Sequence, residues 1–450
     1  MTLYGKHADL AGHSMAEKII IDTPDTLFPF MPPVWELVGW IDDKLSGMPV
    51  LLHRMQEDDD LGLAQLDRKT LRAACTDGVS PRTAEKIEGN LHKAIEKQGV
   101  IELLSRITLE RAIVKDTNGA KWLTFSRGLL EGINQHQSIQ KIELPLTLSF
   151  LERRTEAERE LVLTCHRTRR MEISIEEKLA QIRKAICEAL RHHTLLNSLE
   201  VQSYSAAMID ASRPGKARTT KLSAKILKLL FCLRVDFYHQ LLATFMADML
   251  RIRPSLKLPT LLDDALINQG GMGQLMPLLK QGELITPTNR LYELWCGAYS
   301  PPGESLSYQA MAMHLPCPDP GRTRVGSDSD QQDIESVINE TRLSRLKQWR
   351  GGTVPDTDQL TAFLESMTGE TYGAFLPFIM TRVATAWTKW IEQERAMLKQ
   401  LVQEHPALAE GMDLDWLVER FSRYPQYWEH SNPDIAPGQS EARRCQARWG

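Results

Sequence analysis

Apolar residues recur every three or four positions along most of the chain, the spacing that places them on one face of an α-helix. The clearest pattern runs from about residue 220 to 250 and ends at Arg253-Pro254, because proline disfavours helix in the residue before it. Another begins at Ser174, which has Glu177 three positions later in the arrangement of a capping box, and extends to about Leu196. These patterns predict a mainly α-helical protein.

The region around 100–150 has a different pattern. Two short apolar runs flank Asn118-Gly119, a dipeptide that suits the type I′ turn of a β-hairpin. The run that begins at Lys141 is a candidate for a further strand. The predicted fold class is therefore mainly α, a multi-helical protein of two or three domains with a small β-containing element near 100–150.

The overall composition is that of an ordinary globular protein, with 42% hydrophobic and 25% charged residues. The chain contains no run of 18 uncharged apolar residues, and its first residues lack the apolar core of a signal peptide. We therefore expect a cytoplasmic protein with no membrane contact. The seven cysteines are scattered without a C-x-x-C pair, which favours reduced thiols over a disulfide framework.

The net charge of −4 excludes a protein that is basic throughout, but the charge is unevenly distributed. Seven lysines and arginines and no acidic residue occur between Arg213 and Arg234. From residue 301 to the end, the chain has 15 basic and 21 acidic residues. A nucleic-acid surface is therefore expected in the first half of the chain.

One segment carries a more specific pattern. LDRKTLRAACTDGVSPRTAEKIEGNLHKAI, residues 66–95, has a polar helix start, a turn at Gly78 and a helix that begins with Ser80 and Pro81. The segment resembles the later part of a Cro/C1-type (Xre-like) helix-turn-helix domain, over about 30 of the 450 residues. The residues of the second helix that are expected to face a core are Ala84, Ile87, Leu91 and Ala94.

The resemblance implies DNA binding through the exposed start of the first of these helices. Arginine, lysine and threonine side chains there can reach base edges and phosphates in the major groove. An ordinary helical hairpin with a charged, solvent-exposed face is the alternative interpretation. The candidate nucleic-acid-binding residues of the segment are Arg68, Lys69, Thr70, Arg72 and Arg82.

A second basic segment opens the long helix that is predicted from about residue 220. Its cations crowd the end of the helix where the dipole disfavours positive charge, by roughly 0.3–1 kcal/mol each. Phosphate groups would offset that cost, and so would pairing with the acidic C-terminal half inside the protein. The candidate residues of this segment are Arg213, Lys216, Arg218, Lys221, Lys225 and Lys228.

These features divide the chain into parts. A stretch rich in Pro, Gly, Asp and Ser provides the main boundary. Most aromatic residues of the C-terminal part are expected in a core, with a docking surface as the alternative. The predicted parts are an irregular segment 1–33, a domain 34–150 with the helix-turn-helix-like segment and the hairpin, a central helical domain 151–314 with the basic stretch 213–234, a linker 315–333, a C-terminal helical domain 334–430 and a disordered tail 431–450.

Motifs for common enzymatic chemistry are missing from the sequence. It has no phosphate-binding loop, no nucleophile elbow and no H-E-x-x-H metal motif. Glu176-Glu177-Lys178 contains the E-x-K of metal-dependent nucleases, but a capping box explains these residues. We therefore assign no catalytic residue, metal or cofactor, and we favour a protein that is not an enzyme.

The sequence favours a cytoplasmic nucleic-acid-binding protein with DNA as the ligand, such as a regulator or a component of a mobile-element or defence complex. In this hypothesis the C-terminal helical half binds protein partners. The alternative is a helical adaptor or scaffold subunit of a multiprotein complex without direct nucleic-acid contact. The choice between DNA and RNA, the sequence specificity and the oligomeric state stay open.

Overall fold

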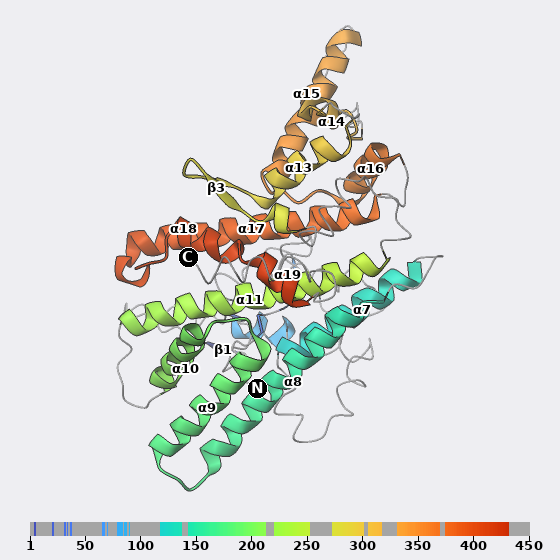
Figure 1. Cartoon of the computed structure of the whole chain (residues 1–450). Helices are drawn as coiled ribbons and strands as arrows, with labels where there is room; N and C mark the ends of the chain where they lie inside the picture. Colours follow the sequence, from blue (N-terminus) through green and yellow to red (C-terminus); the bar gives the residue numbers. More distant parts are fainter. Residues whose placement is uncertain are drawn as a thin grey trace. The chain divides into compact units, whose positions relative to one another are not determined.

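The computed structural model of the chain describes residues 118–136, 143–212, 220–252, 272–300, 305–316, 331–369 and 374–431, together with scattered positions before residue 91. The chain divides into two compact units, each discontinuous in sequence. Unit 1 consists of residues 1–128 and 152–189, and unit 2 consists of residues 129–151 and 190–450. Figure 1 shows the helices that account for most of the described residues.

The prediction of a mainly α fold with a small β element is confirmed. None of the described helices is long and apolar enough to cross a membrane. The α-helices are α7 (Asn118–His136), α8 (Pro145–Arg170), α9 (Ile175–His193), α10 (Ser198–Ser212), α11 (Thr220–Ile252), α13 (Pro287–Ala298), α14 (Tyr308–Ala312), α15 (Gln331–Arg350), α16 (Thr357–Thr368), α17 (Phe375–Glu404), α18 (Leu414–Phe421) and α19 (Tyr424–Ser431). The 3₁₀ turns are η3 (Gly273–Leu275) and η4 (Pro406–Leu408), and the antiparallel strand pairs are β1 (Tyr4–Gly5) with β2 (Ile20–Ile21) and β3 (Leu278–Lys280) with β4 (Glu283–Ile285).

Local sequence signals mark several helix ends correctly. Helix α9 begins directly after Ser174, whose Oγ accepts a hydrogen bond from Glu177 N at 3.2 Å while the Glu177 carboxylate accepts one from Ser174 N at 3.0 Å. The capping box predicted at this position is therefore confirmed. Helix α11 spans the apolar pattern that predicts it. Asp413 caps α18 by accepting a hydrogen bond from Trp416 N at 2.8 Å.

The hairpin predicted around Asn118-Gly119 is wrong, because these residues begin helix α7. Gly119 N donates a 2.9 Å hydrogen bond to Oε2 of Glu158, a buried residue of α8. A Cβ atom on Gly119 would lie 2.9 Å from the Cα of Thr155. Glycine is therefore required here for a close contact between two helices, and a turn is not its role. Residues 100–117 lie outside the described residues.

The strand predicted from Lys141 is also wrong, because helix α8 begins at Pro145. Proline suits the first turn of a helix, where its missing N–H group has no partner to lose. The free N–H groups of this turn are bound by Asp248 of α11, whose carboxylate accepts from Thr147 N at 2.8 Å and from Leu146 N at 3.1 Å. The residues wrongly predicted as strands thus lie at the starts of two helices, and the first turn of each helix is bound by an acid that is distant in sequence.

The longer of the two described strand pairs lies at β3–β4 rather than near 100–150. Its two-residue turn is Gln281-Gly282, and both residues have positive φ angles, of 55° and 80°. A type I′ turn requires such angles at both central positions. The dipeptide lacks the asparagine or aspartate that usually marks this turn in a sequence.

Helix α11 is the centre of unit 2, where it packs against α10, α18, α19 and η4 (Figure 1). The ring of its Tyr238 lies 4.9 Å from that of Trp390 in α17, and the ring of Phe231 lies 5.0 Å from that of Trp416 in α18. Most C-terminal aromatic residues are core residues, as expected. The buried ones are Trp349, Phe363, Trp387, Trp390, Phe421, Tyr424, Tyr427 and Trp428.

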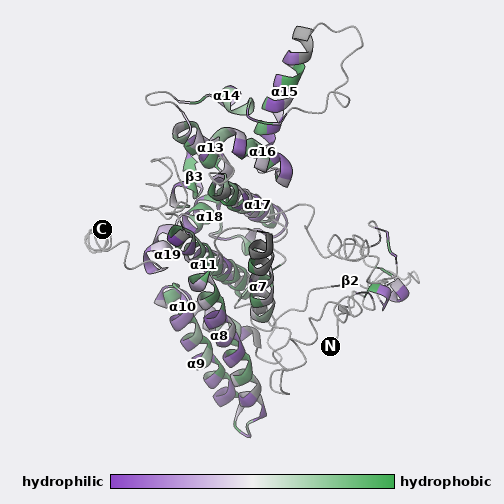
Figure 2. Cartoon of the chain, turned by 90° about the vertical axis from the view of Figure 1, so that its right-hand side faces the viewer, coloured by the Kyte–Doolittle hydropathy of each residue, from purple (hydrophilic) through white to green (hydrophobic). Residues whose placement is uncertain are grey.

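The structure groups the helices differently from the predicted domains. Helices on both sides of the predicted linker 315–333 belong to unit 2, where α13 packs on α17 and α14 packs on α15. Residues 317–330 of that linker lie outside the described residues. Figure 2 shows hydrophilic residues along α8, α9 and α15, so these helices offer polar faces to solvent.

His239 of α11 is completely buried in the aromatic core of unit 2. Its Nε2 lies 2.9 Å from the carbonyl oxygen of Phe421, and its ring packs against those of Trp387, Tyr424 and Tyr427. Burial lowers the pKa of His239 to about 4, although the hydrogen bond with the Phe421 carbonyl acts in the opposite direction. His239 is therefore a neutral structural residue at neutral pH.

We expect the free energy of unfolding to fall as the pH decreases below about 6.5, because the unfolded chain then binds a proton at His239 that the folded chain takes up only near pH 4. Between pH 7 and pH 5 this residue accounts for a loss of about 2 kcal/mol. Urea unfolding of the wild type and His239→Gln at both pH values measures the effect, and the variant is expected to lose about 2 kcal/mol less. Equal losses in the two proteins would contradict this role.

Gly119→Ala is expected to destabilise the protein by about 1–3 kcal/mol, the usual cost of overpacking, because the added methyl group meets the backbone of Thr155. Gly128 lies in the same helix with nothing within 4 Å of its Cβ position, so Gly128→Ala is the matched control. The control is expected to stabilise by roughly 0.5–1 kcal/mol through helix propensity. Thermal unfolding compares the two variants, and stabilisation by Gly119→Ala would refute the close contact.

Candidate nucleic-acid interface

Asp67 and Thr70 mark the start of the first helix in the helix-turn-helix-like segment. Thr70 N donates to Oδ1 of Asp67 at 2.8 Å, and the Thr70 hydroxyl donates to Oδ2 at 2.8 Å. Asp67 therefore makes the bonds of an N-cap, and the hydroxyl predicted to contact nucleic acid already has a partner. The other predicted residues of this helix, Arg68, Lys69 and Arg72, lie outside the described residues.

The second helix of the segment begins after Ser80, as predicted, and the described residues between 81 and 87 are helical. Ile87 has no exposed surface, which confirms that this side of the helix faces a core. Arg82 and Lys86 are exposed one turn apart, so the two cations share the outer face. Neither makes an ion pair with any residue that the structure describes. The sequence predicts Arg82 as a site residue, whereas no sequence signal distinguishes Lys86 from other surface lysines.

The basic start of α11 is described in part. Lys221 lies in the first turn of the helix, and the side chain of Lys225 is exposed. Lys228 Nζ donates a 2.8 Å hydrogen bond to the carbonyl of Gly411 and lies 5.1 Å from the centroid of the Trp416 ring. The charge of Lys228 is therefore used within unit 2, where its partners are a backbone carbonyl and an aromatic ring and not the acidic residues that the sequence suggests. The candidates Arg213, Lys216 and Arg218 lie outside the described residues.

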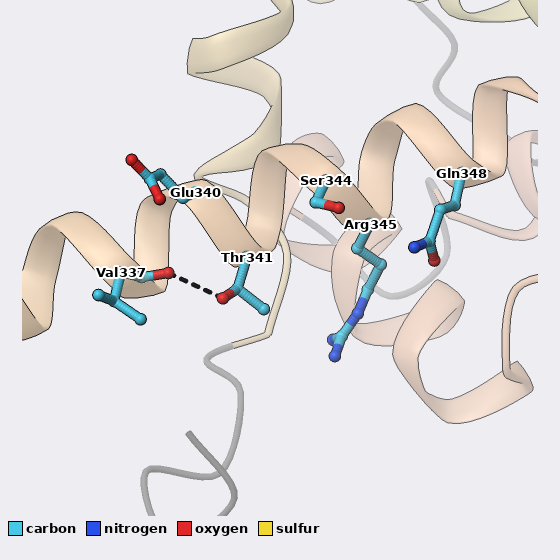
Figure 3. A pocket seen from close by; sticks show the side chains of 6 residues that line it. All are labelled: Val337, Glu340, Thr341, Ser344, Arg345 and Gln348. Carbon is cyan, nitrogen blue, oxygen red and sulfur yellow. Dashed lines mark hydrogen bonds between the residues drawn. The ribbon is translucent and has the colours of Figure 1, made fainter. Parts of the chain in front are cut away.

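The face of α15 carries an open hollow of about 420 Å³ that the predicted sites do not include. In Figure 3 the side chains of Arg345 and Gln348 point to the same side of the helix, and Glu340 points away from them. The hollow therefore has an end rich in hydrogen-bond donors toward the C-terminus of α15. The described residues that line it are Val337, Glu340, Thr341, Ser344, Arg345 and Gln348.

A sequence signal for this face exists, although the count of charged residues over the last third of the chain hides it. Residues 341–355 contain four lysines and arginines and no acidic residue. One of the four, Arg350, lies 3.7 Å above the centroid of the Tyr308 ring, so its charge is used in packing. The acidic residues after residue 301 lie in other segments, so the basic stretch is apparent only when charge is counted over a short segment.

Two of the buried acids of unit 2, Asp236 and Asp248, bind backbone groups. Oδ1 of Asp236 accepts a hydrogen bond from Leu195 N at 2.8 Å, and Asp248 binds the start of α8. Among the residues that the structure describes, no group of three or more histidine, cysteine, aspartate or glutamate side chains is arranged to hold a metal ion. These two buried acids therefore serve the packing of helices, and the exposed cations are the better candidates for function.

Comparison with known proteins gives no relative of this chain. No protein-family model, curated protein or solved structure matches it. The function is therefore inferred from the residues and geometry of the chain itself.

Lys228→Met is expected to lower the free energy of unfolding by about 1–2 kcal/mol, because it removes a charged hydrogen bond to Gly411 and the contact with Trp416. Lys225→Met changes an exposed position one turn earlier, so it is the control, with an expected effect within about 0.5 kcal/mol. Urea unfolding of both variants measures the difference. Equal effects would show that the internal contacts of Lys228 contribute nothing to stability.

Proposed function

We propose that this chain is a cytoplasmic nucleic-acid-binding protein with DNA as its ligand, and that it acts without catalysis. The observation that carries the proposal is the described helix of the helix-turn-helix-like segment. This helix buries Ile87 and exposes Arg82 and Lys86 on its outer face. A buried side that anchors the helix and an outer side with cations is the arrangement that phosphate contacts require.

The electrostatics of the outer face support the same proposal. Arg82 and Lys86 have no acidic partner among the described residues, so a phosphate would not have to displace one. Each cation that meets a phosphate releases condensed counterions, and this release favours binding at low salt. Glu85 is exposed beside them and reduces the local charge, which makes its removal an informative change.

A helical adaptor subunit is the second candidate function, and the position of Lys228 favours it. One of the cations expected to hold phosphate contacts Gly411 and Trp416 inside unit 2 instead. An adaptor would use the remaining charges to meet acidic proteins. It would show no steep salt dependence with nucleic acid, so one binding measurement separates the two candidates.

The affinity of the full chain for a short DNA duplex is expected to fall steeply with salt, as fluorescence anisotropy would measure. Arg82→Glu combined with Lys86→Glu is expected to weaken binding roughly tenfold or more, because two phosphate contacts become repulsive. The magnitude of the slope of log K against log salt is expected to fall by about 2. Glu85→Gln is expected to bind slightly more tightly than the wild type.

Arg153→Glu combined with Arg183→Glu is the matched control, since both arginines are exposed in unit 1 and the charge change is the same. This variant is expected to keep the salt slope of the wild type. Lys221→Glu with Lys225→Glu tests the basic start of α11 in the same assay. If DNA binding is absent or insensitive to salt, the adaptor function is favoured. If the chain binds RNA more tightly than DNA, the proposed ligand changes from DNA to RNA.

A further inference from the structure

Helix α15 has cations that its own packing does not use. Arg345 lines the hollow and Lys347 is exposed two residues later, and neither makes an ion pair with a residue that the structure describes. Lys347 and Arg350 lie in the last turn, where they complement the helix dipole. Arg345 lies before that turn, so the dipole does not explain it.

The side chains between these cations are hydrogen-bond donors. Ser344 and Gln348 are exposed, and helical geometry places them between Arg345 and Lys347 on the surface of α15. Arginine, lysine, serine and glutamine are among the residues that contact phosphate oxygens in nucleic-acid complexes. The four residues occupy little more than one helical turn, with the two cations at opposite edges of the face and the two neutral donors between them.

We propose that the C-terminal half of this face, formed by Ser344, Arg345, Lys347 and Gln348, binds neighbouring phosphate groups of a nucleic-acid backbone. The proposal rests on the proposed function and adds a contact surface in unit 2. Arg345 and Lys347 supply positive charge from the two edges of the face. Ser344 and Gln348 donate hydrogen bonds to the phosphate oxygens between them.

The chemistry of the face favours a phosphate over a protein or a lipid bilayer. Protein interfaces are held by apolar and aromatic anchors, and helices that lie in a membrane surface insert apolar side chains. Val337 is the one large apolar residue exposed in the described part of α15, and it lies two turns before Arg345. The C-terminal half of the face therefore offers charge and hydrogen bonds without an apolar anchor.

Glu340 sets the limit of the site. It lines the other end of the hollow and makes no ion pair with a described residue. A phosphate placed there would meet a like charge, so the ligand is confined to the end with Arg345. Glu340→Gln is therefore expected to strengthen binding, which is opposite in sign to the loss of either cation.

The test measures binding of the full chain to a short DNA duplex over a range of salt concentrations. Arg345→Glu combined with Lys347→Glu is expected to weaken binding roughly tenfold and to reduce the salt slope by about 2. Lys280→Glu combined with Lys399→Glu makes the same charge change at exposed positions of the same unit, and is expected to keep the slope of the wild type. Circular dichroism of both variants establishes that the helices are intact.

The outcomes separate this proposal from the proposed function. If the wild type binds DNA and the Arg82 and Lys86 variant weakens it, while the α15 variant equals its control, the phosphate site is overturned and the proposed function stands. If the wild type binds no nucleic acid, both are overturned. If the α15 variant loses binding to vesicles of anionic phospholipid while its binding to DNA is unchanged, the ligand of this face is a membrane surface, and the proposal is overturned.

Discussion

The first N–H groups of a helix have no partner within the helix, and leaving them buried without one costs more than most single contacts contribute. Here, buried carboxylates from distant residues bind such groups at two helix starts, and a third binds the backbone between two helices. Glu158 binds the start of α7, Asp248 binds the start of α8, and Asp236 binds the backbone between α9 and α10. Burial raises the pKa of Asp248, while the hydrogen bonds from Thr147 and Leu146 lower it, so the bonds offset part of the cost of burying the charge. The placement of helices within each unit depends on these acids.

Because these buried acids bind backbone groups, other buried polar groups of unit 2 are also interpreted as structural. Asp236 and His239 lie one turn apart on α11, a pairing that in a cleft would suggest acid–base chemistry. Here the Asp236 carboxylate is bound to Leu195 N and to the Gln240 amide, and aromatic rings enclose the imidazole of His239. Both groups are completely buried, so neither reaches a ligand. The chemistry available to a partner is therefore found on the exposed cations.

The sequence predicts those features whose partners lie three or four residues apart. The bonds between Ser174 and Glu177, the helix start at Ser80 and the apolar stripe of α11 all belong to this class. Prediction fails where the partner is remote. Gly119 meets a residue 39 positions away, and Lys228 meets one 183 positions away. The Asn-Gly pair is read as a turn because its actual constraint, the approach of α8, leaves no mark near it in the chain.

The same limit applies to charge. A sum over the last 150 residues is acidic, yet a phosphate meets only the donors within a few ångströms, and a short basic stretch on α15 places four of these within about one turn. Conversely, the most basic run of the chain contains Lys228, whose ammonium already has a carbonyl and an aromatic ring as partners. A candidate contact therefore needs a cation without an ion-pair partner that shares one helix face with other cations or hydrogen-bond donors. Arg82 and Lys225 remain candidates, Lys228 does not, and Lys86, the half-buried Arg345 and the exposed Lys347 join them.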